Sequence, residues 1–175
     1  EKTTGFVPNF RPPAEWHNWM FGIIDAWIKW LDYTTQIDYA NREFDAVVGT
    51  GGSHATINLL MADPNIANIK NVLISTTQTL TATQVIDHAG MTFYFKPQAE
   101  YVKSGAVTPA ISIQADRTTI YGGRVMAFNG VSDKGIQIES GFKNCLISGV
   151  RFNDCTTAIN DLGTGNTLSD NIEEV

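Results

Sequence analysis

Short apolar segments alternate with turn-forming residues along most of the chain. Between residues 70 and 172, runs of three to five mainly apolar residues are separated by stretches rich in Gly, Asn, Asp, Ser and Thr. Runs of this length bounded by turn residues are typical of short β-strands. Apart from the repeated segments described next, the pattern predicts strands at 110–114, 135–140 and 157–160.

Two of the apolar segments repeat each other at a fixed offset. TTIYGGRVMAF (118–128) aligns with CLISGVRFNDC (145–155), so that Ile120 corresponds to Ile147 (147 − 120 = 27). The other matched positions are Gly122 with Gly149 and Arg124 with Arg151. The recurrence of Ile-x-Gly-x-Arg in register indicates a structural repeat.

Weaker copies extend the repeat in both directions. Phe93, in the segment GMTFYFKP, lies upstream of the first copy by the same offset (120 − 93 = 27), and KNVLIS at 70–75 would be one turn earlier. Downstream, Leu168 follows the second copy at a shorter offset (168 − 147 = 21). This last copy places Ile172 within one position of the place that Phe152 holds.

A loosely kept period in the twenties predicts the stacked turns of a parallel β-helix. Each turn needs neighbours above and below to bury its apolar face, and insertions at the corners change the period without disturbing the strands. A β-sandwich would explain the short strands but not a repeat kept in register. The sequence therefore predicts a mainly β fold, a right-handed parallel β-helix, in which Ile120, Ile147 and Leu168 stack inside at equivalent positions.

The front of the chain has helical periodicity instead. Apolar residues recur in steps of four and three from Trp16 to Trp30, which predicts a helix over about 13–32. Neighbouring apolar residues leave this helix only a narrow polar strip. We therefore expect other protein surfaces, from copies of this chain or from a different protein, to cover more than half of the helix circumference. We therefore divide the chain into an N-terminal Trp-rich helical segment, 1–43, and a β-helix domain, 44–175.

A short capping helix is expected where the β-helix domain begins. FDAVVGTGG at 44–52 predicts a strand that ends in a glycine-rich turn. The turn lacks the Lys-Ser/Thr pair of a phosphate-binding loop, so its glycines are better explained by tight backbone geometry. Ser53 is a candidate N-cap for a helix within residues 53–63, which Pro64 would stop. Such a helix would protect the first strands of the β-helix.

Composition and charge narrow the function classes. The formal net charge of −6 lacks the basic excess that a nucleic-acid binder needs. Five ionisable residues interrupt the apolar run of 13–32, and its polar strip is not basic, so we expect no membrane insertion. Cys145 and Cys155 are expected to be free thiols, and without a secretion signal the chain is expected to be made in a reducing cytosol.

The front segment carries a resemblance to a known family. FRPPAEWHNW (10–19) and the helix after it resemble the front end of tail fibre and tailspike-like proteins of tailed bacteriophages. DAVVGTGGSHATINLLM (45–61) is similar to the strand, glycine turn and helix that open the pectate-lyase-like β-helices of these proteins. The chain departs from the large tailspikes in being short, with no evident distal receptor-binding domain.

The resemblance implies a structural virion component, synthesised in the cytoplasm of the host bacterium. It implies a homotrimer whose N-terminus attaches to other virion proteins of the tail or another exterior appendage. The β-helix would then project outward, with a host-surface glycan as a further candidate partner.

The aromatic and charged side chains of the front segment are candidates for the docking interface, since Trp and Arg often dominate binding energies. The proposed interface residues are Phe10, Arg11, Trp16, Trp19, Trp27 and Trp30. The alternative is that three copies of the helix pack against one another or against the first strands.

A glycan-cleaving lyase or hydrolase is the alternative function, and it would need two carboxylates about 5–10 Å apart. The candidate acids of the repeat region form no Asp-Asp or Asp-x-Asp cluster, and most look like solvated turn residues. They are Asp116, Asp133, Glu139, Asp154, Asp161 and Asp170. We therefore expect no enzyme activity, no cofactor and no metal.

Other candidate residues also have structural explanations. His17 and His54 look isolated, and His88 beside Asp87 looks like a turn pair. Arg124 and Arg151, at matching positions, fit a ladder on the outside of the β-helix. Glycan binding without catalysis would use aromatic side chains that stack on sugar rings; the candidates are Tyr94, Tyr101 and Tyr121.

Overall fold

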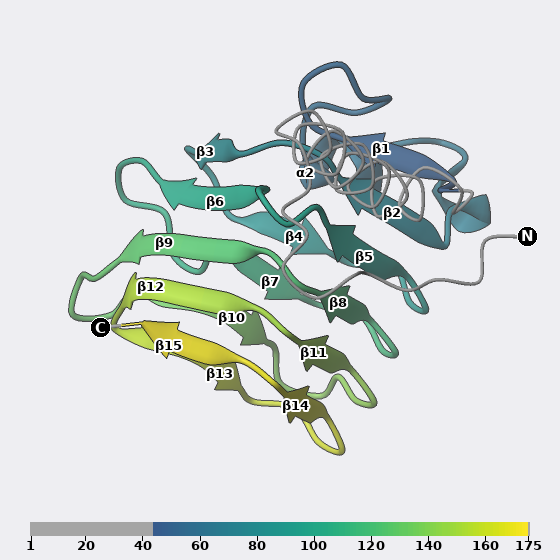
Figure 1. The fold of residues 1–175 in the computed structure, drawn as a ribbon. Coiled ribbons are helices and arrows are strands. Elements are labelled where there is room, and N and C mark those ends of the chain that lie inside the picture. Colours follow the sequence, from purple (N-terminus) through teal and green to yellow (C-terminus); the bar gives the residue numbers. More distant parts are fainter. Residues whose placement is uncertain (1–43, 175) are drawn as a thin grey trace, which may run out of the picture. The chain divides into compact units, whose positions relative to one another are not determined.

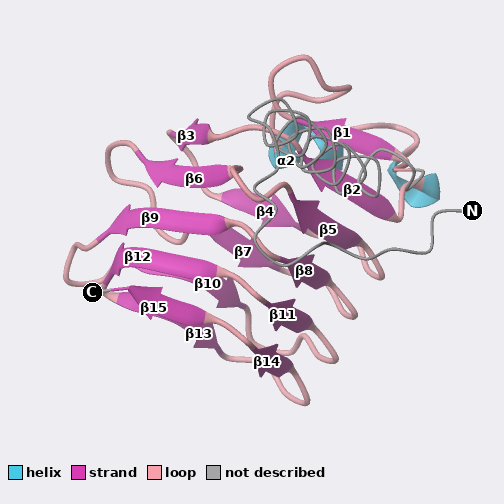
Figure 2. Cartoon of the chain, viewed as in Figure 1, coloured by secondary structure: helices cyan, strands magenta, loops and turns pink. Residues whose placement is uncertain are grey.

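The computed structural model describes residues 44–174. These residues form a parallel β-solenoid of about five turns, as the repeat predicts, and Figure 2 shows that strands make up nearly all of its regular structure. The expected helix at 13–32 and all six proposed docking residues lie outside the described residues.

Three parallel sheets form the sides of the solenoid (Figure 1). Sheet A contains β1 (Ala46–Val48), β2 (Asn71–Ile74), β5 (Thr92–Phe95), β8 (Thr119–Tyr121), β11 (Leu146–Ser148) and β14 (Thr167–Ser169). Sheet B contains β3 (Gln78–Leu80), β6 (Glu100–Lys103), β9 (Arg124–Phe128), β12 (Arg151–Cys155) and β15 (Ile172–Glu174). Sheet C contains β4 (Gln84–Ile86), β7 (Ile111–Ile113), β10 (Lys134–Ile138) and β13 (Thr157–Asp161).

Each full turn passes through sheets A, B and C in that order, and the register follows the sequence repeat. Phe93 pairs with Ile120, and Ile120 pairs with Ile147, at the offset that the repeat predicts. Ile147 in turn pairs with Leu168, at the predicted shorter offset. The strands expected at 110–114, 135–140 and 157–160 are β7, β10 and β13 of sheet C.

The inward side chains of successive turns stack into one apolar core. Phe93, Ile120 and Ile147 are each at most 1% exposed. Leu168 holds the equivalent place in the last turn but is 45% exposed, because no further turn of the described chain covers it. The prediction that Leu168 stacks in register with Ile147 is therefore confirmed. The prediction that its side chain is buried in the core is wrong.

The last turn of sheet B settles an alignment that the sequence left open by one position. Ile172 pairs with Arg151, and Glu173 pairs with the buried Phe152. Ile172 therefore lies one position before the place of Phe152, within the range that the repeat predicted. An acid at the inward position costs little here, because the end of the described stack leaves Glu173 exposed to water.

The capping helix is shorter than predicted and begins later. Helix α2 spans Ile57–Met61, Thr56 is its N-cap, and a single 3-10 turn follows at Ile66–Asn68. Ser53 is not the cap, because its hydroxyl bonds instead to the backbone N–H and C=O of Val47, each at 3.1 Å. The Gly52 turn brings Ser53 to this position, and a Cβ on Gly52 would lie 2.4 Å from the Val47 carbonyl oxygen.

Helix α2 covers the first strand of sheet C. Ile57 and Leu60 are fully buried, and the Asn58 side chain completes the edge of β4. Its Oδ1 accepts the Val85 N–H at 2.8 Å, and its Nδ2 donates to the Thr83 carbonyl at 2.8 Å. The helix therefore protects this end of the solenoid, as a cap should.

Candidate interaction surfaces

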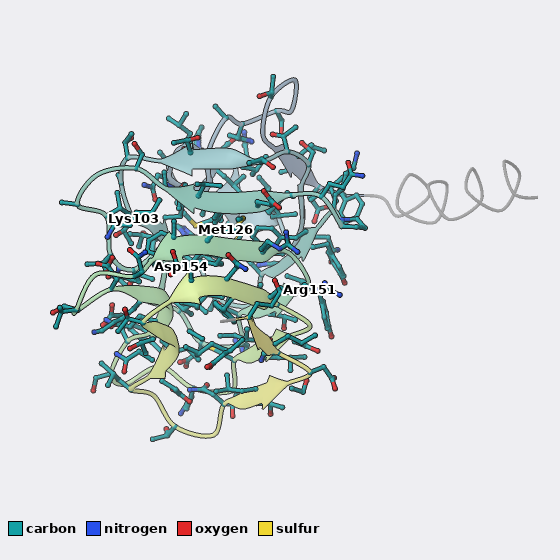
Figure 3. The ribbon with its side chains drawn as sticks, turned by 60° about the vertical axis from the view of Figure 1, so that its left-hand side comes forward. Lys103, Met126, Arg151 and Asp154 are labelled. Atoms are coloured by element: carbon teal, nitrogen blue, oxygen red, sulfur yellow. The ribbon has the colours of Figure 1, made fainter. Side chains whose placement is uncertain are left out.

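The outward face of sheet B carries an ion-pair ladder. Arg124 and Arg151 are register partners, as the repeat predicted. Arg124 lies 3.2 Å from Glu100 and 3.8 Å from Glu174, and Arg151 lies 3.6 Å from Glu174. Figure 3 looks onto this face and labels Arg151, Met126, Asp154 and Lys103 along it. The two carboxylates relieve the repulsion between the stacked guanidinium groups.

Asp133 is enclosed rather than solvated, which corrects the expectation for this residue. It forms an ion pair with Lys103 and accepts the Gly130 N–H at 2.8 Å. The hydrogen bond from Lys103 holds the pKa of the Asp133 carboxyl below its ordinary value. The ammonium group of Lys103 also lies 5.8 Å from the centre of the Phe128 ring. The pair therefore fixes the corner between sheets B and C.

Four of the other candidate acids hold nearby parts of the chain. The Glu139 carboxylate accepts from Ser112 at 2.8 Å and from Gln137 at 2.6 Å. The remaining bonds are Asn129 to Asp154 at 2.7 Å, the Lys143 N–H to Asp116 at 3.0 Å, and the Gly163 N–H to Asp161 at 2.9 Å. Asp170 sits at a turn with a φ of 56°. Between residues 44 and 174 no group of three or more His, Cys, Asp or Glu residues could hold a metal ion.

His54 is not isolated, contrary to the sequence expectation. Its Nε2 lies 2.8 Å from the Asp63 carboxylate, and its Nδ1 lies 3.0 Å from the Ser53 hydroxyl. A Ser–His–Asp chain suggests a nucleophile, but the Ser53 oxygen is already held by both backbone groups of Val47. These hydrogen bonds among Ser53, His54 and Asp63 therefore connect the Gly-rich turn to the segment that follows α2. His88 pairs with Asp87 at 2.7 Å, as expected.

The three candidate tyrosines have different environments. Tyr101 is fully buried in the core, against Phe95, and cannot stack on a sugar. Tyr94 and Tyr121 lie on the outward face of sheet A with their rings stacked at 5.4 Å. Phe44 meets Tyr94 edge to face at 5.6 Å. The sequence indicated Phe44 only as the first residue of the strand predicted within 44–52, and not as a partner of Tyr94; it lies two residues before β1.

The cysteines are free thiols, as expected. Cys145 is buried and Cys155 is partly buried. Burial raises the pKa of both thiols, which makes them poor nucleophiles at neutral pH.

No family model, curated protein or solved structure matches the chain. Within residues 44–174, no helix is long and apolar enough to cross a membrane.

Proposed function

We propose that the chain is a structural component of a tailed bacteriophage particle, of the tail fibre or tailspike type. Residues 6–33 dock to other virion proteins through the six aromatic and charged residues named above. The β-solenoid projects outward from the tail or another exterior appendage, where it contributes to attachment to the host surface. The working unit is a homotrimer.

The observation that carries the proposal is the order of the two parts along the chain. The segment at 10–19 resembles the front of phage fibre proteins, and that resemblance implies a parallel β-helix behind it. A parallel β-solenoid occupies 44–174. We assign it the right-handed sense, because parallel strand–crossover–strand connections are right-handed in about 98% of cases.

A structural role also fits the chemistry of the described surface. Apart from the turn residue Asp170, each candidate acid has a hydrogen-bonded or ionic partner that fixes a corner or a strand.

Quantitative mass spectrometry of purified particles tests the proposal. In particles of the phage that encodes this chain, we expect its peptides at a copy number divisible by three. Absence of the chain from particles that have been washed at high salt would overturn the structural role.

A further inference from the structure

Sheet A differs from the other two sheets in its charge. None of its six strands contains Asp, Glu, Lys or Arg. The strands of sheet C contain Lys134 and Asp161. The charged residues in the strands of sheet B are Glu100, Lys103, Arg124, Arg151, Asp154, Glu173 and Glu174.

The outward positions of sheet A form an apolar and aromatic column in its upper turns. Val47, Leu73, Tyr94 and Tyr121 follow one another in register from β1 to β8. Tyr121 is 39% exposed, so part of its ring faces water, whereas Leu73 in the same column is only 7% exposed. The column continues through two small residues, Ser148 and Ser169, whose hydroxyls bond to each other at 3.1 Å. The strands therefore offer a face with aromatic rings and no charge to desolvate.

We propose that the outward face of sheet A is the surface through which copies of this chain associate. The inference rests on the self-association in the proposed function and names the face that is used. Each copy carries a formal net charge of −6, so identical copies repel one another, and a contact through an uncharged face adds no close pairs of like charges to this repulsion. Of the three outward faces, only that of sheet A has strands without charge.

The other two faces are less suited to a contact between identical copies. Burying the sheet B ladder would strip water from Arg124, Arg151 and their carboxylate partners. Sheet C presents a polar network in which Glu139 and Asn160 bond to Gln137. Stacked aromatic rings, by contrast, supply large contact area at low entropic cost, as at many interface centres.

Substitutions in the full-length chain test this face. Tyr121→Glu places a charge in the column, and Met126→Glu is the matched control, since Met126 faces outward from sheet B in the same turn. By sedimentation equilibrium at micromolar concentration, we expect the mass to fall from 57.6 kDa (3 × 19.2 = 57.6) to 19.2 kDa for Tyr121→Glu only. Circular dichroism establishes that both variants keep the strand signal.

Photochemical tyrosine cross-linking of mixed light and heavy isotope-labelled chains adds a readout on the unaltered protein. We expect dityrosine between Tyr121 of a light copy and Tyr94 or Tyr121 of a heavy copy. Three results would overturn the inference: a trimer that survives Tyr121→Glu, dissociation by Met126→Glu alone, or Tyr121 cross-links confined to single chains, as when residues 1–33 cover the face. A monomeric wild-type protein would instead refute the self-association in the proposed function.

Discussion

The side chain of Asn58 takes the place of a neighbouring strand for Val85. Its Oδ1 accepts the Val85 N–H at 2.8 Å, so a five-residue helix satisfies an edge that has no further strand beside it among residues 44–174. Exposed parallel edges invite pairing with other chains, and one amide group prevents this at β4.

Replacing Asn58 with Leu tests this edge protection. The change removes two hydrogen bonds and leaves a partly buried N–H and C=O unpaired, so we expect the free energy of unfolding to fall by about 2–4 kcal/mol. Urea unfolding monitored by circular dichroism measures it. Leu59→Ala, on the exposed side of the same helix, should change stability by less than about 0.5 kcal/mol. Equal effects of the two variants would contradict the role of Asn58.

Ile147→Asp tests the stacked core. Ile147 is fully buried between Ile120 and Leu168, so an aspartate there places an unpaired charge among apolar side chains. We expect a loss of at least about 4 kcal/mol, or no folded protein. The matched change Leu168→Asp, in the half-exposed last turn, should cost less than half as much. Thermal melts of the two variants decide between these outcomes.

Tyr101→Phe is expected not to weaken the fold. Tyr101 is fully buried, and no hydrogen-bond partner for its hydroxyl is found among the described residues. The Gln78 amide, its register partner on β3, is also unpaired there. Removing an unpaired hydroxyl removes a desolvation cost, so we expect stability to rise by up to about 1 kcal/mol. A fall of more than about 1 kcal/mol in urea unfolding would show that the hydroxyl has a partner.

The Lys103–Asp133 pair predicts a dependence of stability on pH. The folded state lowers the pKa of Asp133, so the ionised carboxylate stabilises the fold above the unfolded pKa, near 3.8. This contribution is lost as the pH falls through the lower, folded pKa. Asp133→Asn should therefore be less stable than the wild type at pH 7, and the difference should shrink at pH 3. A difference that stays constant over this range would exclude the carboxylate as its source.

We expect no cleavage of host-surface polysaccharide. Incubation with capsule or lipopolysaccharide should release neither reducing ends nor unsaturated uronic ends above the level of a heat-denatured sample. Turnover that a single substitution such as Glu139→Gln abolishes would establish the glycan-cleaving alternative.

The repeat region could be predicted because stacked turns place apolar residues at equivalent positions, which recur in the sequence at a nearly constant spacing. Phe93, Ile120 and Ile147 occupy one register, and their spacing alone gave the pairing of sheet A. The last turn was harder, since its positions are not enclosed from both sides. Glu173 could therefore replace an apolar residue, and the sequence placed Ile172 only to within one position of Phe152.

Contacts between distant residues could not be read from the spacing. Lys103 and Asp133 belong to different turns, so nothing local in the sequence distinguishes Asp133 from a solvated turn acid. Ser53 has the residue type of an N-cap, but the turn before it returns its hydroxyl to Val47 and leaves the cap to Thr56. Tyr101 and Tyr121 are the same residue type on neighbouring turns. They differ only in the side of the strand on which the side chain lies: Tyr101 points into the core and Tyr121 points outward.

Deletion of residues 1–33 tests the central claim most directly. The measurement is the amount of chain in purified particles, relative to a major capsid protein, when the phage carries either the full or the shortened chain. We expect the shortened chain to keep its strand signal in circular dichroism and its oligomeric mass, yet to be absent from particles. Incorporation at the full-length level, or loss of the fold or of the oligomer on deletion, would contradict a docking role for this segment.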